Sequence, residues 1–258
     1  MAYDGTAYKG WQVQPNGTTV QGVLEKALST LLGQEIQVTG AGRTDTGVHA
    51  SYYVAHFDIP DAEKEHPSGS LDPADKQFVF RLNRFLPGDM VVYQVQQVPA
   101  EMHARFSATY RTYHYHISTV KPLFNRDYAH YLYGKLDTAE IGRCCDIILE
   151  TTDFTSFSKL HTDVKTNNCR VMEAAWKTTE NGYRFEIRAD RFLRNMVRSL
   201  VGTLVDVGKG KLDHTDFRRI AEAKDRGKAG QSAPAHALFL VDIGYENISS
   251  PLISSPLK

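Results

Sequence analysis

The sequence predicts a mixed α/β (α+β) fold in which largely antiparallel strands are flanked by helices. Segments whose apolar residues recur every three or four positions, typical of amphipathic helices, alternate with segments whose apolar residues recur at every second position, typical of half-buried strands. A hairpin signal, Asn181-Gly182, joins two of the strand-like segments and favours antiparallel pairing. The sequence contains neither a GxGxxG motif nor a phosphate-binding loop, which disfavours a Rossmann fold.

Five helices are expected. They cover residues 18–33, 72–86, 137–150 and 192–207, and a short helix begins near residue 215. In the first helix, Thr18 is the expected N-cap residue and Gly33 is the expected stop. In the second helix, the expected inner face carries Phe78, Leu82 and Phe85.

The strand pattern occurs in both parts of the chain. The expected strands are residues 36–39, 51–59, 91–95, 112–117, 171–178, 183–190 and 238–245. Residues 60–71 contain two prolines and mixed polar residues, so an exposed loop is expected there. The two parts of the chain are expected to be diverged versions of one plan of strands and helices.

Composition limits the class of protein. A chain of 258 residues with 41% hydrophobic residues suits one large domain or two joined halves. No apolar run is long enough to cross a bilayer, and the N-terminus lacks the basic and then apolar order of a signal peptide, so a soluble cytoplasmic protein is expected. Cys144, Cys145 and Cys169 lack metal-ligand spacing and are expected to be buried thiols.

The charge pattern is informative although the formal net charge is zero. Five arginines lie between residues 184 and 198, against two acidic residues, and a local positive face of this kind can hold phosphates. Arg188, Arg191 and Arg194 are the candidate contacts to an RNA backbone. The alternative is an ordinary solvated surface of mixed charge.

One segment concentrates the chemistry. Residues 40–50, GAGRTDTGVHA, set Asp45 between two threonines on a glycine-rich loop that lies between two expected strands. Such an aspartate is either a turn cap or a catalytic group, because Asp and Thr side chains also stabilise turns. The oxygen ligands and the terminal Glu of a calcium loop are missing. A rigid scaffold on both sides of a loop can aim a side chain.

The same segment resembles the signature of the TruA family of tRNA pseudouridine synthases. Further matches follow in order along nearly the whole chain. They are Tyr3-Asp4-Gly5-Thr6, Gly10-Trp11-Gln12, Leu82-Asn83, Leu86-Pro87-Gly88-Asp89, HARFSA at 103–108, DFTSF at 153–157, NMVR at 195–198, Lys224-Asp225-Arg226, Ala229-Gly230 and Ala233-Pro234-Ala235. The resemblance implies the pseudouridine synthase fold, with one α/β half at residues 1–104, a second at 105–258, and a central cleft.

The resemblance also implies an activity. Enzymes of this family isomerise uridine to pseudouridine at positions 38, 39 and 40 of the tRNA anticodon stem-loop and work as homodimers. The reaction breaks the C1′–N1 bond, turns the base and rejoins it through C5, and it needs neither redox chemistry nor an energy source. We therefore expect tRNA as partner, and no cofactor and no metal.

Site residues follow from the matched motifs. Asp45 is the expected catalytic carboxylate, acting either as a nucleophile on C1′ or as a base on C2′, and Arg198 is its expected cationic partner from the other half. Tyr113 is expected to stack on the uracil and to move the C5 proton. Arg43 is expected to act as a wedge or phosphate contact, and Leu238 as the apolar floor. His49 and His103, which lie in matched motifs, are expected to be structural.

Two departures and two alternatives remain open. The chain has fewer residues before Tyr3 than the family usually has, and Ala237 stands where the family often has glycine. One alternative is a non-catalytic RNA-binding protein that kept the groove and lost the chemistry. The other is a hydrolase that uses Asp45 with a histidine or a metal, for which His114 and His116 are the nearest pattern.

Overall fold

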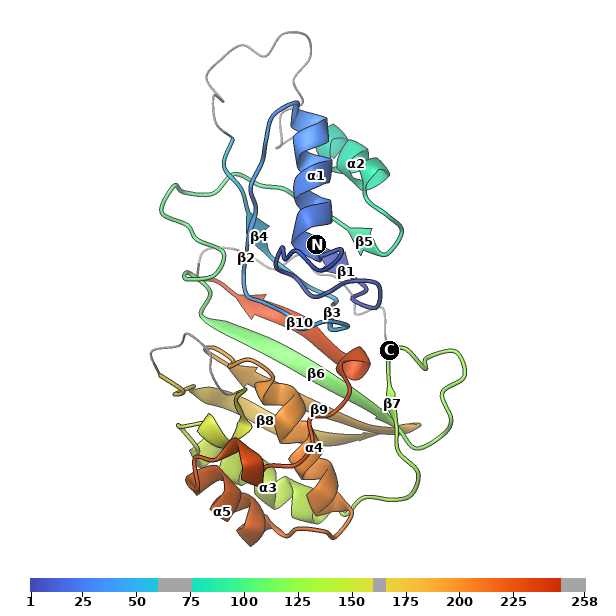
Figure 1. The fold of residues 1–258 in the computed structure, drawn as a ribbon, viewed down its shortest axis with the longest axis vertical. Coiled ribbons are helices and arrows are strands. Elements are labelled where there is room, and N and C mark those ends of the chain that lie inside the picture. Colours follow the sequence, from blue (N-terminus) through green and yellow to red (C-terminus); the bar gives the residue numbers. More distant parts are fainter. Residues whose placement is uncertain (60–75, 160–165, 247–258) are drawn as a thin grey trace. The chain divides into compact units, whose positions relative to one another are not determined.

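A computed structural model describes residues 1–59, 76–159 and 166–246 (Figure 1). The chain forms two compact units. Unit 1 contains residues 1–109 and the segment from Ile243 onward, and unit 2 contains Tyr110–Asp242. The predicted division between residues 104 and 105 stays a prediction.

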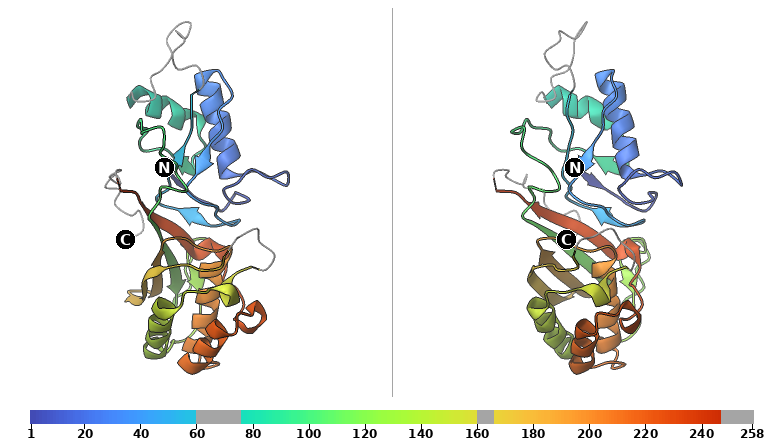
Figure 2. Two further views of the ribbon diagram at one scale, coloured as in Figure 1. Left: turned by 90° about the vertical axis from the view of Figure 1, so that its left-hand side faces the viewer. Right: turned by 60° about the vertical axis from the view of Figure 1, so that its left-hand side comes forward.

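Unit 1 combines short strands with two helices. Its elements are β1 (Ala2–Tyr3), α1 (Val20–Leu32), β2 (Thr39–Gly40), β3 (His49–Ala50), β4 (Ala55–His56), α2 (Lys76–Phe85) and β5 (Met90–Val91). Strand β1 lies between β3 and β5 and is antiparallel to both, whereas β2 pairs antiparallel with β4. The helices α1 and α2 pack against each other (Figures 1 and 2).

Helix α1 begins one residue later than the sequence suggested. Thr19, not Thr18, is the N-cap: its backbone is extended and its hydroxyl accepts the Gly22 N–H at 3.3 Å. The Thr18 carbonyl is instead engaged by the Lys9 N–H. Gly33 ends the helix with φ 69°, as predicted, because a left-handed C-cap favours a residue without a Cβ.

Only part of the strand predicted over residues 51–59 forms, as β4 at Ala55–His56, because the chain changes partners before it. The Tyr53 N–H donates to the Met1 carbonyl, whereas the next carbonyl, that of Val54, accepts from Ala41. This switch separates β3 from β4 and places them in different pairings. The expected strand at 91–95 is likewise shorter, since β5 ends at Val91.

The second predicted helix is partly correct. Helix α2 buries Phe78 and Leu82 completely, but Phe85 is 52% exposed and does not share their face. Phe85 is the last residue of the helix. The predicted start near Asp72 and the predicted loop at 60–71 lie outside the described residues.

Unit 2 is built on longer strands. Its elements are β6 (Tyr110–Ser118), β7 (His130–Tyr131), α3 (Thr138–Glu150), η1 (Thr155–Phe157), β8 (Val171–Thr179), β9 (Gly182–Ala189), α4 (Met196–Gly208), α5 (His214–Glu222), η2 (Arg226–Lys228), η3 (Ala235–Ala237) and β10 (Leu238–Gly244), whose last two residues belong to unit 1. The strand order is β10-β6-β9-β8. Strand β9 is antiparallel to β6 and β8, and β7 is parallel to β6. Helices α3, α4 and α5 lie together on one face of this sheet (Figure 1).

Most predicted elements of unit 2 are confirmed. The side chain of Asp137 caps α3 by accepting the Glu140 N–H at 2.9 Å, and β8 and β9 form the expected hairpin. Helix α4 begins at Met196 rather than at residue 192, because Asn195 has φ 66° and interrupts the helical backbone. The predicted mixed, largely antiparallel α/β fold is confirmed.

The three cysteines all lie in unit 2 and are buried, as predicted. Burial raises the pKa of each of these thiols to about 12. They are therefore inert thiols that fill the core around α3 and the start of β8.

Candidate functional site

The loop that carries Asp45 connects β2 to β3 in unit 1. The Val48 N–H donates to the Asp45 carbonyl at 3.1 Å, and Gly47 has φ 78°, so Asp45 opens a tight turn that needs glycine at its third position. Asp45 is half-buried, Thr44 is buried and Arg43 is exposed. The turn explains part of the Thr-Asp-Thr-Gly pattern, and the backbone carbonyl of Asp45 accepts the hydrogen bond that closes it.

Two glycines of unit 1 let other backbone segments approach this loop closely. A Cβ on Gly5 would lie 2.0 Å from the Val48 carbonyl oxygen, and a Cβ on Gly10 would lie 2.4 Å from the Thr44 carbonyl oxygen. Gly10 also has φ 85°. The adjacent Trp11 N–H donates to the same Thr44 carbonyl. The matched motifs near the N-terminus therefore hold the backbone on both sides of Asp45.

Aromatic side chains hold the loop from another direction. The Tyr3 hydroxyl lies 2.9 Å from the Thr44 hydroxyl, and the Tyr53 hydroxyl donates to the Gly42 carbonyl at 2.5 Å. The rings of Trp11 and Tyr53 stack with their centres 4.2 Å apart. Tyr53 was missed by sequence reasoning, because only the fold brings it opposite a residue 11 positions earlier.

His49 completes this framework. Its Nδ1 lies 3.0 Å from the Gly5 nitrogen and 3.0 Å from the Asp4 carboxylate, and the residue is 1% exposed. One nitrogen cannot accept from Gly5 and donate to Asp4 at once, so the two contacts are alternatives set by the tautomer. In either form His49 ties β3 to the 3–6 motif, in agreement with a structural role.

Unit 2 carries the other predicted site residues. Tyr113 lies within β6 opposite Ile187 of β9, is half-buried, and packs edge-on against Phe192 with ring centres 5.0 Å apart. Leu238 begins β10 and is buried. Ala237, which stands where glycine was expected, is fully buried in the turn just before it.

Arg198 is held in the first turn of α4 by the chain that precedes β10. Its Nε donates to the Ala233 carbonyl at 2.7 Å, and the Ala233 N–H donates back to the Arg198 carbonyl at 2.9 Å. A Cβ on Gly202 would lie 1.8 Å from the Gln231 carbonyl, so glycine is needed one turn further along. The Ala-Pro-Ala motif, through its first residue Ala233, thus positions this arginine, a role that the sequence did not reveal.

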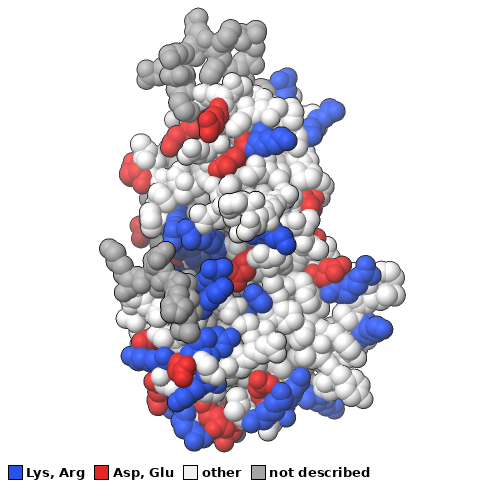
Figure 3. All heavy atoms as spheres, viewed as in Figure 1, with Lys and Arg blue, Asp and Glu red and all other residues white. Residues whose placement is uncertain are grey.

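The arginines predicted to contact RNA differ in their surroundings. Arg188 donates to Glu173 at 2.6 Å and to the Thr112 hydroxyl at 3.0 Å, and its guanidinium lies over the Tyr110 ring. Arg191 is half-buried and Arg194 is exposed. Figure 3 shows basic and acidic side chains interspersed over the helices of unit 2. Contact of these arginines with RNA stays a prediction.

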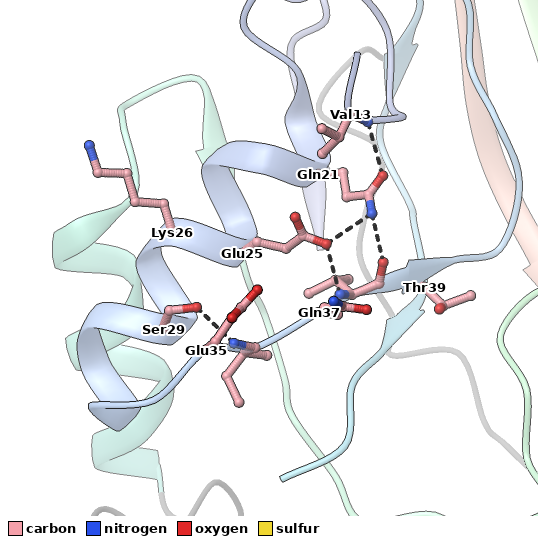
Figure 4. Close-up of a pocket in the computed structure, with 10 residues that line it drawn as sticks. Val13, Gln21, Glu25, Lys26, Ser29, Glu35, Gln37 and Thr39 are labelled. Atoms are coloured by element: carbon pink, nitrogen blue, oxygen red, sulfur yellow. Dashed lines mark hydrogen bonds between the residues drawn. The ribbon is translucent and has the colours of Figure 1, made fainter. Parts of the chain in front are cut away.

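A hollow of about 390 Å³ lies between α1 and residues 35–39 (Figure 4). Its polar side chains are used to satisfy the neighbouring backbone: Glu25 accepts the Val38 N–H, and Gln21 donates to the Val38 carbonyl. None of the predicted site residues lines it. This hollow is therefore a structural junction and not the candidate site.

Two further properties concern ligands and membranes. Within the described ranges, no three His, Cys, Asp or Glu side chains are grouped so that they could hold a metal ion. His114 lies 3.9 Å from Glu186, and burial lowers the pKa of this histidine. No helix in the described part of the chain has the length and apolar character needed to span a membrane.

Comparisons with known proteins agree with the motifs. A family model described as tRNA pseudouridine synthase matches residues 1–107 and 151–246. A relative named tRNA pseudouridine synthase A from Bacteroides thetaiotaomicron is 54% identical over 95% of this chain and 88% of its own length. Relatives of the same name are 50% identical in Porphyromonas gingivalis, over 95% of both chains, and 38% identical in Bacillus subtilis, over 96% of this chain and 98% of the relative.

Proposed function

Since this chain belongs to the tRNA pseudouridine synthase family, we propose that it modifies uridines 38, 39 and 40 in the anticodon stem-loop of tRNA. The chain is an isomerase of the class that converts uridine to pseudouridine. The finer assignment rests on the resemblance of residues 40–50 to the family signature. Proteins recognise an anticodon stem mainly by its shape and its phosphates, which suits an enzyme that accepts uridine at three neighbouring positions.

Asp45 is the proposed nucleophile. The observation that supports this role is the rigid hold on its loop, in which Gly10, Trp11 and Tyr3 contact Thr44 directly before it. In the proposed reaction the carboxylate attacks C1′, and the C1′–N1 bond breaks. The detached uracil turns, C5 bonds to C1′, Asp45 leaves, Tyr113 passes the C5 proton to solvent, and N1 takes up a proton from solvent. Atoms balance without a co-reactant, as an isomerisation requires.

The other residues have supporting roles in this proposal. Tyr113 stacks on the uracil and relays the C5 proton, and Leu238 gives an apolar contact to the base. Arg198 supplies the positive charge in the proposed reaction. The Ala233 carbonyl holds its guanidinium in place beforehand. Arg43, exposed two residues before Asp45, enters the space that the flipped base leaves. The enzyme is expected to act in the cytoplasm as a homodimer.

Tritium release from tRNA labelled at uridine C5 tests the nucleophile. Asp45→Asn is expected to bind tRNA but to release no tritium, whereas Asp58→Asn, which alters an exposed carboxylate of the same unit, is expected to release it at the unmodified rate. Normal release by Asp45→Asn would remove Asp45 from the mechanism. A chelator is expected to have no effect, and loss of tritium release on chelation would show that the reaction needs a metal ion.

The chemical route has its own test. Deuterium at C2′ slows a reaction in which that C–H bond breaks, so abstraction of the C2′ proton predicts a primary isotope effect on a single turnover. Nucleophilic attack at C1′ predicts no primary effect. A primary effect would therefore reassign Asp45 from nucleophile to base.

A further inference from the structure

Phe106 of unit 1 is an exposed aromatic residue at the centre of the matched segment 103–108. It is 76% exposed, although a phenyl ring is among the groups that most favour burial. A single exposed apolar side chain is ordinary on a protein surface. Phe106 differs from such a residue because several specific contacts hold its backbone and its ring.

The turn that presents Phe106 is closed by side-chain hydrogen bonds. The His103 Nδ1 accepts the N–H groups of Arg105 and Phe106, at 3.1 and 3.2 Å. Ser107 closes the same turn twice, since its N–H donates to the His103 carbonyl and its hydroxyl accepts the His103 N–H. The Phe106 backbone is thus held on both sides.

Neighbouring residues of unit 1 anchor the turn from beneath. Ala104 is fully buried, its N–H donates to the His56 Nδ1 at 3.0 Å, and its carbonyl accepts from the Tyr245 hydroxyl at 2.6 Å. Both backbone groups of Ala104 are therefore engaged by side chains distant in sequence. Such an anchor limits the movement of the two residues that follow it.

The ring of Phe106 is supported as well as exposed. The imidazole of His103 lies against it with ring centres 4.4 Å apart, and the rings of His103 and His56 pack 4.8 Å apart. The Arg105 guanidinium lies 5.6 Å from the centre of the Phe106 ring. An exposed flat ring, with an imidazole against it and a guanidinium over it, matches the chemistry of a nucleotide, which offers a flat base and an anionic phosphate.

We propose that Phe106, supported by His103, is a stacking platform for an unpaired base of the RNA substrate. The proposal rests on tRNA being the substrate and adds a binding contact to the catalytic residues named above. Because His103 fixes the platform before RNA arrives, little ordering is needed on binding. Stacking needs a flat π-face and no particular base, so the contact strengthens binding of different tRNAs alike.

Binding and turnover of the full chain test this platform. Loss of one stacked base lowers affinity by about fivefold to a hundredfold. Phe106→Ala is therefore expected to raise the tRNA KM about tenfold, with kcat changed by less than about twofold. Phe124→Ala, which removes a phenyl ring that is 91% exposed and belongs to unit 2, is the matched control and is expected to leave KM unchanged.

Two more substitutions separate stacking from a structural role. Phe106→Trp and Phe106→Tyr keep a flat ring and are expected to retain the unmodified KM. Phe106→Leu keeps apolar volume without a π-face and is expected to resemble Phe106→Ala. Retention of affinity by Phe106→Leu, or a rise in KM that follows a fall in Tm across the four variants, would overturn the platform.

Fluorescence gives a direct signal. The fluorescence of the indole introduced by Phe106→Trp is expected to be quenched when tRNA is added. This quenching is expected to exceed the change seen in the unmodified protein, whose two tryptophans supply the background. Absence of extra quenching under saturating tRNA would contradict stacking. Measured in the Asp45→Asn background, this signal does not depend on turnover, so failure of the catalytic assignment and failure of the platform are distinguishable.

Discussion

Glycine at position 10 shows how one residue without a side chain controls the candidate site. Its φ of 85° is in the left-handed region, and a Cβ there would lie 2.4 Å from the Thr44 carbonyl oxygen. Thr44 directly precedes Asp45. A side chain at position 10 would therefore move the backbone that carries the proposed nucleophile, although it would remove no chemical group.

Gly10→Ala is expected to destabilise the protein by about 2–3 kcal/mol, through backbone strain and displacement of the loop. Because a shift of about 1 Å in a reacting group costs about a hundredfold in rate, kcat is expected to fall by that order. Gly33→Ala is the control, since Gly33 has φ 69° but nothing within 4 Å of its Cβ position. Gly33→Ala is expected to lower the free energy of unfolding by about 1 kcal/mol and to leave kcat unchanged. Both variants are measured for kcat and for stability by urea unfolding. Equal kcat in the two variants would show that the position of the loop does not matter for catalysis.

At the level of single residues, sequence supports a prediction where the signal is local. Asp45 could be singled out because threonine and glycine neighbours are adjacent in the chain. The contacts that hold it could not be read in this way. Tyr3 meets Thr44 across 41 positions, and Ala233 meets Arg198 across 35, so only the folded chain reveals these supports.

Among the elements, helix α1 illustrates how a boundary depends on tertiary contacts. Thr18 and Thr19 are equally good N-cap residues by type. The structure selects Thr19, because the Lys9 N–H engages the Thr18 carbonyl and Gln21 reaches Val13 and Val38 instead of the helix start. The switch that divides β3 from β4 has the same origin, since alternation of apolar residues does not show which partner a strand takes.

The two threonines give a matched test. Thr19→Ala is expected to cost about 1 kcal/mol of unfolding free energy, because the Gly22 N–H loses its acceptor. Thr18→Ala is expected to cost less than about 0.5 kcal/mol of unfolding free energy, because it is a surface substitution that removes no helix cap. Chemical denaturation of the two variants measures the difference. Equal losses, or a larger loss for Thr18→Ala, would refute the assignment of the cap.

At the scale of the whole molecule, half-buried histidines link stability to pH. Burial lowers the pKa of His56 in unit 1 and of His130 in unit 2, and in each case a nearby histidine lowers it further. The unfolded chain binds protons at these groups near pH 6.5, whereas the folded chain resists them. The contribution of these two histidines to the free energy of unfolding is thus complete above pH 6.5, and it is lost as pH falls towards their pKa values in the folded state.

The Tm is therefore expected to fall as pH is lowered from 7.5 to 5.5. Below that range, carboxylates add to the loss, since hydrogen bonds hold the pKa of Asp153 below its usual value despite its partial desolvation. His130→Gln, measured calorimetrically across the same range, is expected to flatten the upper part of the profile. A Tm that is constant between these values, or that rises on acidification, would contradict the assignment.

Unit 1 is interrupted in sequence by the whole of unit 2. The Thr109 N–H bonds to the Gly244 carbonyl, and the Tyr245 hydroxyl bonds to the Ala104 carbonyl. During synthesis, residues 110–242 leave the ribosome before Gly244 and Tyr245 do. Unit 2 can therefore form most of its sheet before the 104–109 segment has made its contacts with residues 244 and 245. In a nascent chain halted before residue 243, unit 1 would lack these contacts.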